Sequence, residues 1–188
     1  ARERDERTKI KYYQAWQVIN SASGKDGDGG RKRAIEDLVA QGAPLEELDV
    51  SHGYLRRLDI GCTEEDIVCP NPVLWGANFQ ESDLMFANLK GINFATASFI
   101  GADMLETNLK NTNLEWTDLS YADMFKANLE GAKLEYANLE GTNLCGANMT
   151  GANLSNVRNW EKIRCIKNAK LNDAIIFFKE PGMDHKFR

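Results

Sequence analysis

The chain has 188 residues, of which 43% are hydrophobic and 27% charged, and its formal net charge at neutral pH is −5. This size predicts one compact folded unit. No apolar run approaches the roughly 20 residues that a membrane-spanning helix needs, which excludes such a helix in this sequence. No signal peptide is visible, but the chain begins with Ala1 rather than Met, so a targeting or anchoring segment upstream is left open.

A helix is predicted for residues 1–22. Its first residues are charged and include oppositely charged pairs at the i, i+4 spacing that supports helices. Apolar side chains then recur on one face, at Ile10, Tyr12, Tyr13, Trp16 and Ile19. This face predicts a helix that packs on the rest of the fold. A helix that binds a partner or lies next to a membrane is the alternative.

Residues 23–30 consist of turn-forming residues and predict a flexible loop. The loop lacks the G-K-[ST] ending of a phosphate-binding loop, and its Asp residues lack the spacing of a calcium-binding EF-hand. A second helix is predicted from Arg31 to Gln41, with Gly42 at its end. Its buried side chains should be Ala34, Ile35, Leu38 and Val39. Residues 1–44 are therefore expected to form a helical N-terminal cap.

A five-residue period begins imperfectly in residues 45–71. Large apolar residues occupy every fifth position, at Leu45, Val50, Leu55 and Ile60. The bulky Leu48 and Leu58 stand where later repeats have small residues, which suits an end layer packed beneath helices. The next centre, Leu74, follows Ile60 by fourteen residues rather than fifteen. The Cys62–Pro72 segment is therefore predicted to be a loop or bulge that carries the slip in phase.

The period becomes regular in residues 72–158. A large apolar residue fills seventeen consecutive centres, namely Leu74, Phe79, Leu84, Leu89, Phe94, Phe99, Met104, Leu109, Leu114, Leu119, Met124, Leu129, Leu134, Leu139, Leu144, Met149 and Leu154. The residue two positions before each centre is usually small, and the residue between them is usually Asn or Asp. Neither an α-helix nor an alternating strand has this period. A solenoid with four sides per turn and about 4.8 Å between coils does have it.

The sequence A-N-L recurs in phase within this stretch, starting at Ala87, Ala127, Ala137 and Ala152. In this respect the chain resembles the pentapeptide-repeat proteins. The resemblance implies an all-β solenoid, specifically a right-handed quadrilateral β-helix, whose interior is filled by the large residue and the small one before it. The motif is specific for the fold but says little about function, because the repeat is architecture.

The phase breaks again at Val157–Trp160. A fragment of the repeat then returns, with centres at Ile166, Leu171 and Ile176 and small residues at Ala169 and Ala174. Residues 159–188 therefore predict a degenerate last coil followed by a basic tail.

No catalytic, cofactor-binding or metal site is predicted, and we expect the protein not to be an enzyme. The two histidines, His52 and His185, belong to no catalytic or metal-binding motif. Asp83, Asp103 and Asp123 have the 20-residue spacing that stacks three carboxylates on one side. A row of metal ligands is one interpretation, but local turn hydrogen bonding is favoured because this position is Asn or Asp in most repeats. The corresponding column on the next side is expected to form amide ladders, through Asn88, Asn108, Asn128 and Asn148.

The four cysteines suggest two pairings. Cys62 and Cys69 bracket the predicted loop and are a candidate disulfide, since their spacing is not that of a zinc site. Cys145 and Cys165 are 20 residues apart, but the break in phase between them argues against stacking.

One side of the solenoid carries a candidate interaction face. The position after each centre is apolar on this side, whereas the equivalent positions on the other sides are largely polar. The candidate residues are Met85, Phe86, Leu105, Phe125, Asp83, Asp103 and Asp123. A second aromatic group is expected around another edge, formed by Trp116, Tyr121 and Tyr136. An exposed apolar stripe marks a contact, either with a partner or with a terminal segment of this chain that folds back over it.

These patterns favour a non-catalytic scaffold that binds an unidentified protein through this face, because a rigid wall loses little entropy on binding. One alternative comes from the resemblance, since acidic pentapeptide-repeat proteins resemble a DNA duplex and bind DNA gyrase. Residues 71–158 hold ten acidic and five basic residues, and their lysines interrupt any continuous negative stripe, which disfavours this alternative. The other alternative is the soluble part of a membrane-tethered protein, whose membrane association would need a segment upstream of Ala1.

Direct binding of nucleic acid is not expected, and the chain is expected to be a monomer or a weak homodimer. The resemblance favours a bacterial source. A cytoplasmic location is favoured, and an exported compartment is the alternative if Cys62 and Cys69 are bonded.

Overall fold

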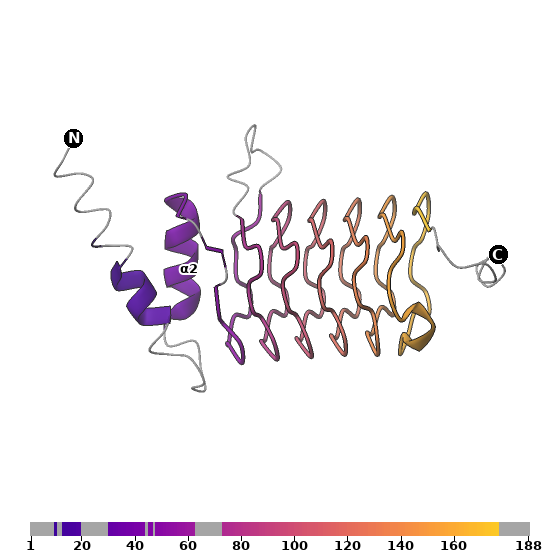
Figure 1. Ribbon diagram of the computed structural model, residues 1–188, viewed down its shortest axis with the longest axis horizontal. Coiled ribbons are helices and arrows are strands. Elements are labelled where there is room, and N and C mark those ends of the chain that lie inside the picture. Colours follow the sequence, from indigo (N-terminus) through magenta and orange to yellow (C-terminus); the bar gives the residue numbers. More distant parts are fainter. Residues whose placement is uncertain are drawn as a thin grey trace.

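The computed structural model describes residues 10, 13–19, 30–43, 45–46, 48–62 and 73–176. Figure 1 shows coils stacked along one long axis, with α2 (Arg31–Ala40) at the N-terminal end and the 3-10 helix η1 (Trp160–Lys162) near the other end. Residues 13–19 are also helical. The chain folds into a right-handed quadrilateral β-helix with helices at its N-terminal end, as the five-residue period and the resemblance predict.

Neighbouring coils are held together by parallel backbone pairing. In the regular part each bridged residue pairs with the residue 20 positions later, as Asp83 does with Asp103 and Asp103 with Asp123. The Leu84 N–H donates to the Asp103 carbonyl at 2.7 Å, and the Asp103 N–H donates to the Ser82 carbonyl at 2.9 Å. Each side contributes one isolated bridge per coil, and the described residues contain no longer strand.

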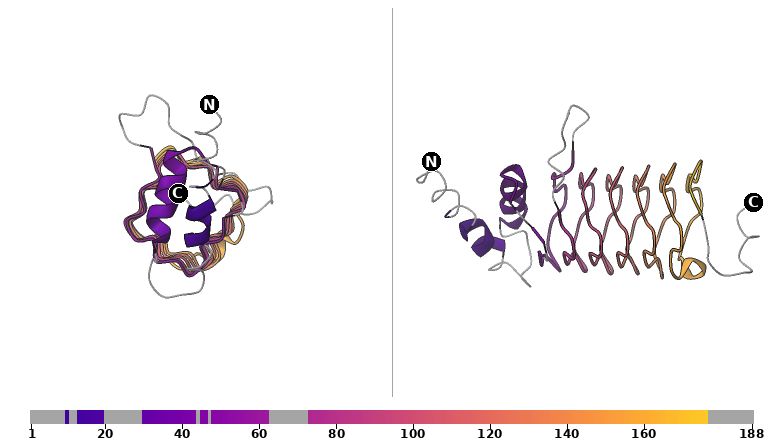
Figure 2. Two further views of the ribbon diagram at one scale, coloured as in Figure 1. Left: turned by 90° about the vertical axis from the view of Figure 1, so that its left-hand side faces the viewer. Right: turned by 45° about the horizontal axis from the view of Figure 1, so that its top comes forward.

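The bridges define four faces, which we name A to D. The bridged residues of face A are Asp49, Asn78, Ser98, Asp118, Asn138 and Arg158, and those of face B are Tyr54, Asp83, Asp103, Asp123, Asn143 and Cys165. The bridged residues of face C are Asp59, Asn88, Asn108, Asn128, Asn148 and Lys170, and those of face D are Val73, Asn93, Asn113, Lys133, Asn153 and Ile175. Seen along the axis, the coils superimpose on one closed outline (Figure 2).

The chain turns each corner at a residue with positive φ. Gly101 (φ 64°) and Tyr121 (φ 60°) occupy equivalent corners of successive coils at the edge between faces A and B. A backbone hydrogen bond closes each turn, such as the one from the Ala102 N–H to the Phe99 carbonyl at 3.0 Å. This left-handed conformation costs a glycine little and strains other residues, which favours Gly and Asn at the corners.

The interior is filled as the period predicts. All seventeen predicted centres are buried, with at most 1% of their surface exposed. Near the N-terminal end the rings of Phe79 and Phe99 stack with centroids 5.1 Å apart, and Phe94 meets both of them edge-on. Inward hydroxyls bond to the backbone, so Thr107 Oγ1 donates to the Leu84 carbonyl at 2.8 Å. Buried polar atoms of this kind are therefore satisfied within the coil stack.

Helices cover the N-terminal end of the stack. The left view of Figure 2 shows α2 crossing the outline of the coils. The four side chains of α2 that the sequence predicts to be inward are buried, and the helix ends at Ala40, one residue before the predicted end. Leu48 and Leu58 are buried in the first coil. Of the helix predicted for residues 1–22, the described part is helical, with Ile19 buried, and the rest lies outside the described residues.

The predicted slip before Leu74 is wrong in size. Asp59 pairs with Asn88, 29 residues later, whereas regular partners are 20 residues apart. The first coil therefore holds nine more residues than a regular one. Ile60 and Leu74 consequently belong to consecutive sides of the solenoid, and the additional residues fall between them.

Two more residues enter the last coil near η1. Asn143 pairs with Cys165, which is 22 residues later, whereas Asn138 still pairs with Arg158 at the regular spacing. The shift places Cys165 beside Cys145, with Cα atoms 5.2 Å apart, and the two form a disulfide. The break in phase, which left this pairing open in the sequence, does not keep the cysteines apart, because η1 takes up the additional residues before the coil resumes. Among the described residues no helix has the length and apolar character to cross a membrane.

Candidate protein-binding face

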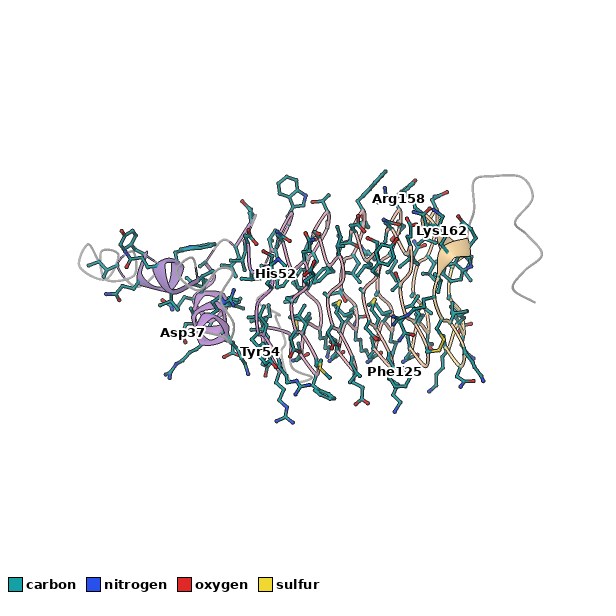
Figure 3. All side chains as sticks on the ribbon, turned by 90° about the horizontal axis from the view of Figure 1, so that it is seen from below. Asp37, His52, Tyr54, Phe125, Arg158 and Lys162 are labelled. Carbon is teal, nitrogen blue, oxygen red and sulfur yellow. A yellow bond between two sulfur atoms is a disulfide. The ribbon has the colours of Figure 1, made fainter. Side chains whose placement is uncertain are left out.

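Face B carries the apolar ladder that the sequence predicts. Met85, Leu105 and Phe125 follow the centres of three successive coils, and all three side chains are half-buried. Coils stack at about 4.8 Å, so each side chain of the ladder is shielded by those of the neighbouring coils. Phe86 lies one residue further on, at the edge between faces B and C, and is 41% exposed. Figure 3 shows Phe125, which belongs to face B, and Arg158, which belongs to face A, on opposite sides of the coil stack.

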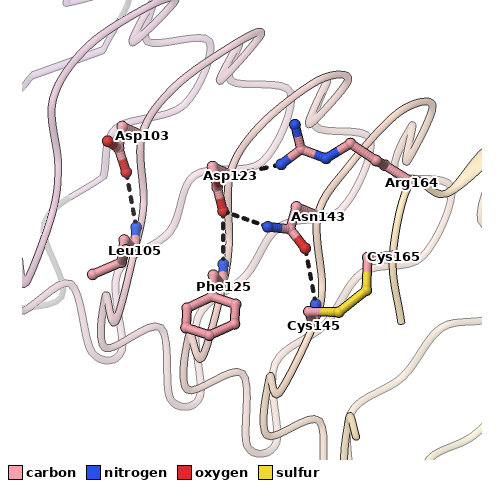
Figure 4. Close-up of polar contacts among 8 residues, drawn as sticks. All are labelled: Asp103, Leu105, Asp123, Phe125, Asn143, Cys145, Arg164 and Cys165. Atoms are coloured by element: carbon pink, nitrogen blue, oxygen red, sulfur yellow. Dashed lines mark hydrogen bonds and ion pairs between the residues drawn. A yellow bond between two sulfur atoms is a disulfide. The ribbon is translucent and has the colours of Figure 1, made fainter. Parts of the chain in front are cut away.

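The carboxylates of face B fix the backbone beneath the ladder. Asp103 Oδ1 accepts a hydrogen bond from the Leu105 N–H at 3.2 Å, and Asp123 Oδ1 accepts one from the Phe125 N–H at 3.1 Å (Figure 4). Asp83 makes the same bond to the residue two positions on, at 3.1 Å. These are the local turn hydrogen bonds that the sequence favours. Within the described ranges, no group of three or more His, Cys, Asp or Glu side chains could hold a metal ion.

Two of the three carboxylates have internal cationic partners. Arg56 Nε lies 3.7 Å from Asp83 Oδ2, and Arg164 Nη2 lies 3.1 Å from Asp123 Oδ2 (Figure 4). Asp103, between them, has no ion pair with any other residue in the described part of the chain. Burial raises the pKa of Asp103, and the neighbouring carboxylates of Asp83 and Asp123 raise it further, whereas the hydrogen bond from the Leu105 N–H and the charge of Arg56 lower it in part. Asp103 is therefore the carboxylate of this row that lacks an ion pair among the described residues.

Cations also lie over the aromatic rings of the face. The Arg56 guanidinium is 5.7 Å from the centre of the Phe86 ring, and Lys126 Nζ is 5.3 Å from the centre of the Phe125 ring. Arg56 Nη2 also lies 2.7 Å from Met85 Sδ. The two ring contacts fall within the range of cation–π attraction.

We expect Asp103→Asn to stabilise the protein at neutral pH, by less than about 1 kcal/mol because the site is partly exposed. The raised pKa means that the folded state binds the proton more tightly than the unfolded state, so stability falls as pH rises through and above the ordinary value of 3.8. An amide fits this position, since Asn143 accepts from the Cys145 N–H at 3.2 Å while donating to Asp123 at 2.8 Å.

Chemical denaturation of both proteins from pH 3 to pH 7 checks this expectation. The gain should vanish below the ordinary aspartate pKa, where both side chains are neutral. A variant that is less stable than the wild type at pH 7, or that shows the same gain at every pH, would contradict it.

The remaining faces are more polar, and one sequence prediction about them is wrong. Trp116 and Tyr136 stack at the edge between faces D and A, with ring centroids 4.2 Å apart, but Tyr121 lies at the next edge, between A and B. The three rings therefore form no single group, because Tyr121 follows a centre of a different face. On face C the Asn108 amide donates to Asn88 at 3.0 Å, as expected for a stacked column.

The predicted cysteine loop is described only at its start. Cys62 is disulfide-bonded, and Cys69, the partner that the sequence predicts, lies outside the described residues. In the first coil His52, a corner residue, pairs through Nδ1 with Glu81 of the next coil at 3.1 Å. A shallow cavity of about 570 Å³ lies between residues 14–18 and α2, away from face B. Its lining contains no histidine or cysteine and does not match a predicted site.

The comparison with protein families decides what this solenoid is. The model described as "Pentapeptide repeats (8 copies)" matches residues 77–115, 87–124, 97–135 and 122–158. The chain belongs to the pentapeptide-repeat family. No curated protein matches the sequence significantly.

Solved structures of other pentapeptide-repeat proteins match the chain along most of its length. One, from the thylakoid lumen of Arabidopsis thaliana, is 32% identical, and the match covers 62% of this chain and 68% of that one, with a TM-score of 0.41. HetL, involved in heterocyst differentiation regulation in the cyanobacterium Nostoc sp. strain PCC 7120, is 22% identical, with coverages of 75% and 62% and a TM-score of 0.43. QnrB1, a plasmid-mediated fluoroquinolone resistance protein, is 16% identical, with coverages of 72% and 80% and a TM-score of 0.26.

The pentapeptide repeat alone does not reveal the cations of face B. Arg56 and Asp83 lie on adjacent coils only because the first coil holds nine additional residues, and Arg164 reaches Asp123 only because the last coil holds two. Lys126 lies in the regular part of the repeat, so its contact with the ring of Phe125 could have been predicted from its corner position next to that residue.

Proposed function

We propose that this pentapeptide-repeat protein is a non-catalytic scaffold that binds another protein through face B. The observation that carries the proposal is the continuous column of Met85, Leu105 and Phe125, with Phe86 exposed beside it. The helices cross the end of the stack, so the described residues leave the side of face B open (Figure 2). A surface fixed by backbone pairing in every coil loses little entropy when a partner binds.

The chemistry of face B favours a protein over nucleic acid. Nucleic acids are bound largely by basic side chains that neutralise phosphates. Face B instead presents a row of three aspartates, and its cations Arg56, Arg164 and Lys126 are engaged with carboxylates of the chain itself. Half-buried apolar side chains with a charged border are typical of protein contacts, in which a few central residues supply most of the affinity.

Changing Leu105 to Glu and Phe125 to Lys together should abolish association with the partner and leave the fold intact. Both side chains point away from the core, so the change removes apolar contact without opening a cavity. Partner capture and sedimentation measure association, including any weak homodimer, and circular dichroism measures folding. Ala95→Glu is the matched control, because Ala95 takes the equivalent position on face D, where the next coils already carry Glu115 and Glu135.

Association that survives the double change in a folded protein would refute a role for face B. Loss of folding would also count against the proposal, since it would mean that a segment of the chain itself packs on this face.

We further propose that the protein works in an oxidising compartment. Cys62 is disulfide-bonded, and Cys145 and Cys165 are bonded to each other. Disulfides persist mainly in secreted, periplasmic or comparable compartments and are rare in the cytosol. The two bonded sites therefore favour the exported alternative over the cytoplasm.

A further inference from the structure

We propose that the protein bound at face B anchors itself with an arginine side chain, inserted above Gly101 between Tyr121 and Glu81. This inference rests on the proposed protein-binding role of face B. It adds the chemistry of the partner and a site at the edge between faces A and B that the apolar ladder does not include.

A glycine creates the space at this edge. The corner residues of successive coils are His52, Glu81, Gly101, Tyr121 and Gly141. A Cβ added to Gly101 would meet only the Glu81 side chain within 4 Å, at 3.4 Å from Cγ. Two coil spacings, about 10 Å, separate the backbones at Glu81 and Tyr121. The corner at Gly101 is therefore a gap in a column of side chains.

The ring of Tyr121 forms one wall of the gap. A Cβ added to Gly141 would lie 2.5 Å from Tyr121 Cδ1 and 2.7 Å from Cε1, so the ring packs against the Gly141 backbone. The ring does not come within 4 Å of the Cβ position at Gly101, and Tyr121 is 61% exposed. One side of the ring is thus supported by Gly141, and the other side faces the gap.

Carboxylates flank the gap. Asp103 follows Gly101 by two residues, at most about 7 Å along the chain. Glu81 lies on the other side, and its side chain is 56% exposed although it pairs with His52. A guanidinium is planar, stacks on aromatic rings and donates several hydrogen bonds to carboxylates, which matches an aromatic wall with acids around it.

The chain itself shows how face B uses arginine. Arg56 pairs with Asp83, and Arg164 pairs with Asp123, so the carboxylates on either side of Asp103 each receive an arginine of this chain. Asp103 carries the same carboxylate in the same position of the intervening coil. The charge of Arg56 lowers its pKa, but among the described residues no arginine lies within ion-pair distance of it. An arginine of the partner would complete this row.

Binding of a small arginine probe tests the gap directly. N-acetyl-arginine methylamide should shift the NMR signals of the Gly101 amide and the Tyr121 ring in a saturable way. The neutral citrulline analogue should not shift them, because it lacks the charge. Gly101→Asn should weaken binding of the arginine probe by about tenfold or more, because the Asn side chain fills the gap.

The backbone allows this substitution. Asn111 and Asn156 occupy corners with φ of 57° and 55°, close to the 64° of Gly101. Gly151→Asn is the matched control, since Gly151 is a corner with φ of 66° and has no atom within 4 Å of an added Cβ. This control should bind the arginine probe as the wild type does.

The outcomes separate this inference from the proposed function. Failure of the arginine probe to bind the wild type, or equal binding by Gly101→Asn, would overturn the arginine site and leave face B untouched. The Leu105→Glu, Phe125→Lys protein should lose the partner but still bind the probe. Partner capture that Gly101→Asn does not weaken would show that the gap takes a free cation instead, and would also overturn the inference.

Discussion

Replacing Leu129 with alanine should lower the free energy of unfolding by about 2–5 kcal/mol, the usual cost of removing a large buried side chain. Leu129 is fully buried at a centre of face C, and Leu109 and Met149 occupy the same position in the coils below and above. The backbone of each coil is pinned to its neighbours by hydrogen bonds, so the core has little freedom to close the cavity. Leu114→Ala, at an equally buried centre of face D, should cost a similar amount.

Glu130→Ala is the control for this prediction. Glu130 follows Leu129 directly, but its side chain is 41% exposed and pairs with Lys110 at 2.9 Å on the surface. An exposed ion pair contributes about 0–1 kcal/mol, so this change should be nearly neutral. Urea denaturation of the three variants gives the comparison. Equal effects at residues 129 and 130 would mean that the assignment of inward and outward positions is wrong.

Replacing both Cys145 and Cys165 with serine should lower the free energy of unfolding by about 3 kcal/mol. The bond closes a loop across a sequence separation of 20 residues, and in the chain-entropy model the loss of such a cross-link relaxes the unfolded state by about this amount. The bond also fastens the last coil, whose centres Ile166 and Leu171 are only partly buried, to the regular stack.

The single variant Cys145→Ser should be destabilised about as much as the double variant, because either change breaks the same bond. Mass spectrometry of unreduced digests should find the bond in freshly isolated protein, as an oxidising compartment requires. A double variant as stable as the wild type would contradict the stabilising role. Free Cys145 and Cys165 in freshly isolated protein would contradict the proposed compartment.

The sequence predicts the interior well because the five-residue period assigns every inward position by its phase in the repeat. Each centre from Leu74 to Leu154 is identified by sixteen others at the same spacing, and a shift of one residue would place Asn or Asp in the core. The helix that covers the end was also predictable, since the apolar face formed by Ile35 and Leu38 has no other surface to cover.

The two irregular coils were less predictable for the same reason. A period of five fixes positions only up to multiples of five, so the separation of fourteen positions from Ile60 to Leu74 fits a slip of one as well as an insertion of nine. The break in phase between Cys145 and Cys165 left their pairing open in a similar way, because the inserted residues change which positions meet. Only the pairing between coils resolves these cases, and with them the ion pairs of Arg56 and Arg164.

The proposed binding face depends on this sorting of positions into faces. Leu105 and Ala95 stand in equivalent positions of repeats that are two apart, and both are half-buried, but they lie on different faces. Their place within the repeat does not distinguish them, but the 20-residue spacing puts only Leu105 in the column with Met85 and Phe125, and the pairing between coils places that column on face B.

The dissociation constant of the captured partner, measured by calorimetry for Leu105→Glu and Ala95→Glu, tests the central claim most directly. The account predicts that Leu105→Glu weakens binding by at least about thirtyfold, as expected for a central contact residue. Ala95→Glu should leave the dissociation constant unchanged, and both proteins should unfold at the same denaturant concentration as the wild type. Equal dissociation constants for the two folded variants would contradict the assignment of binding to face B.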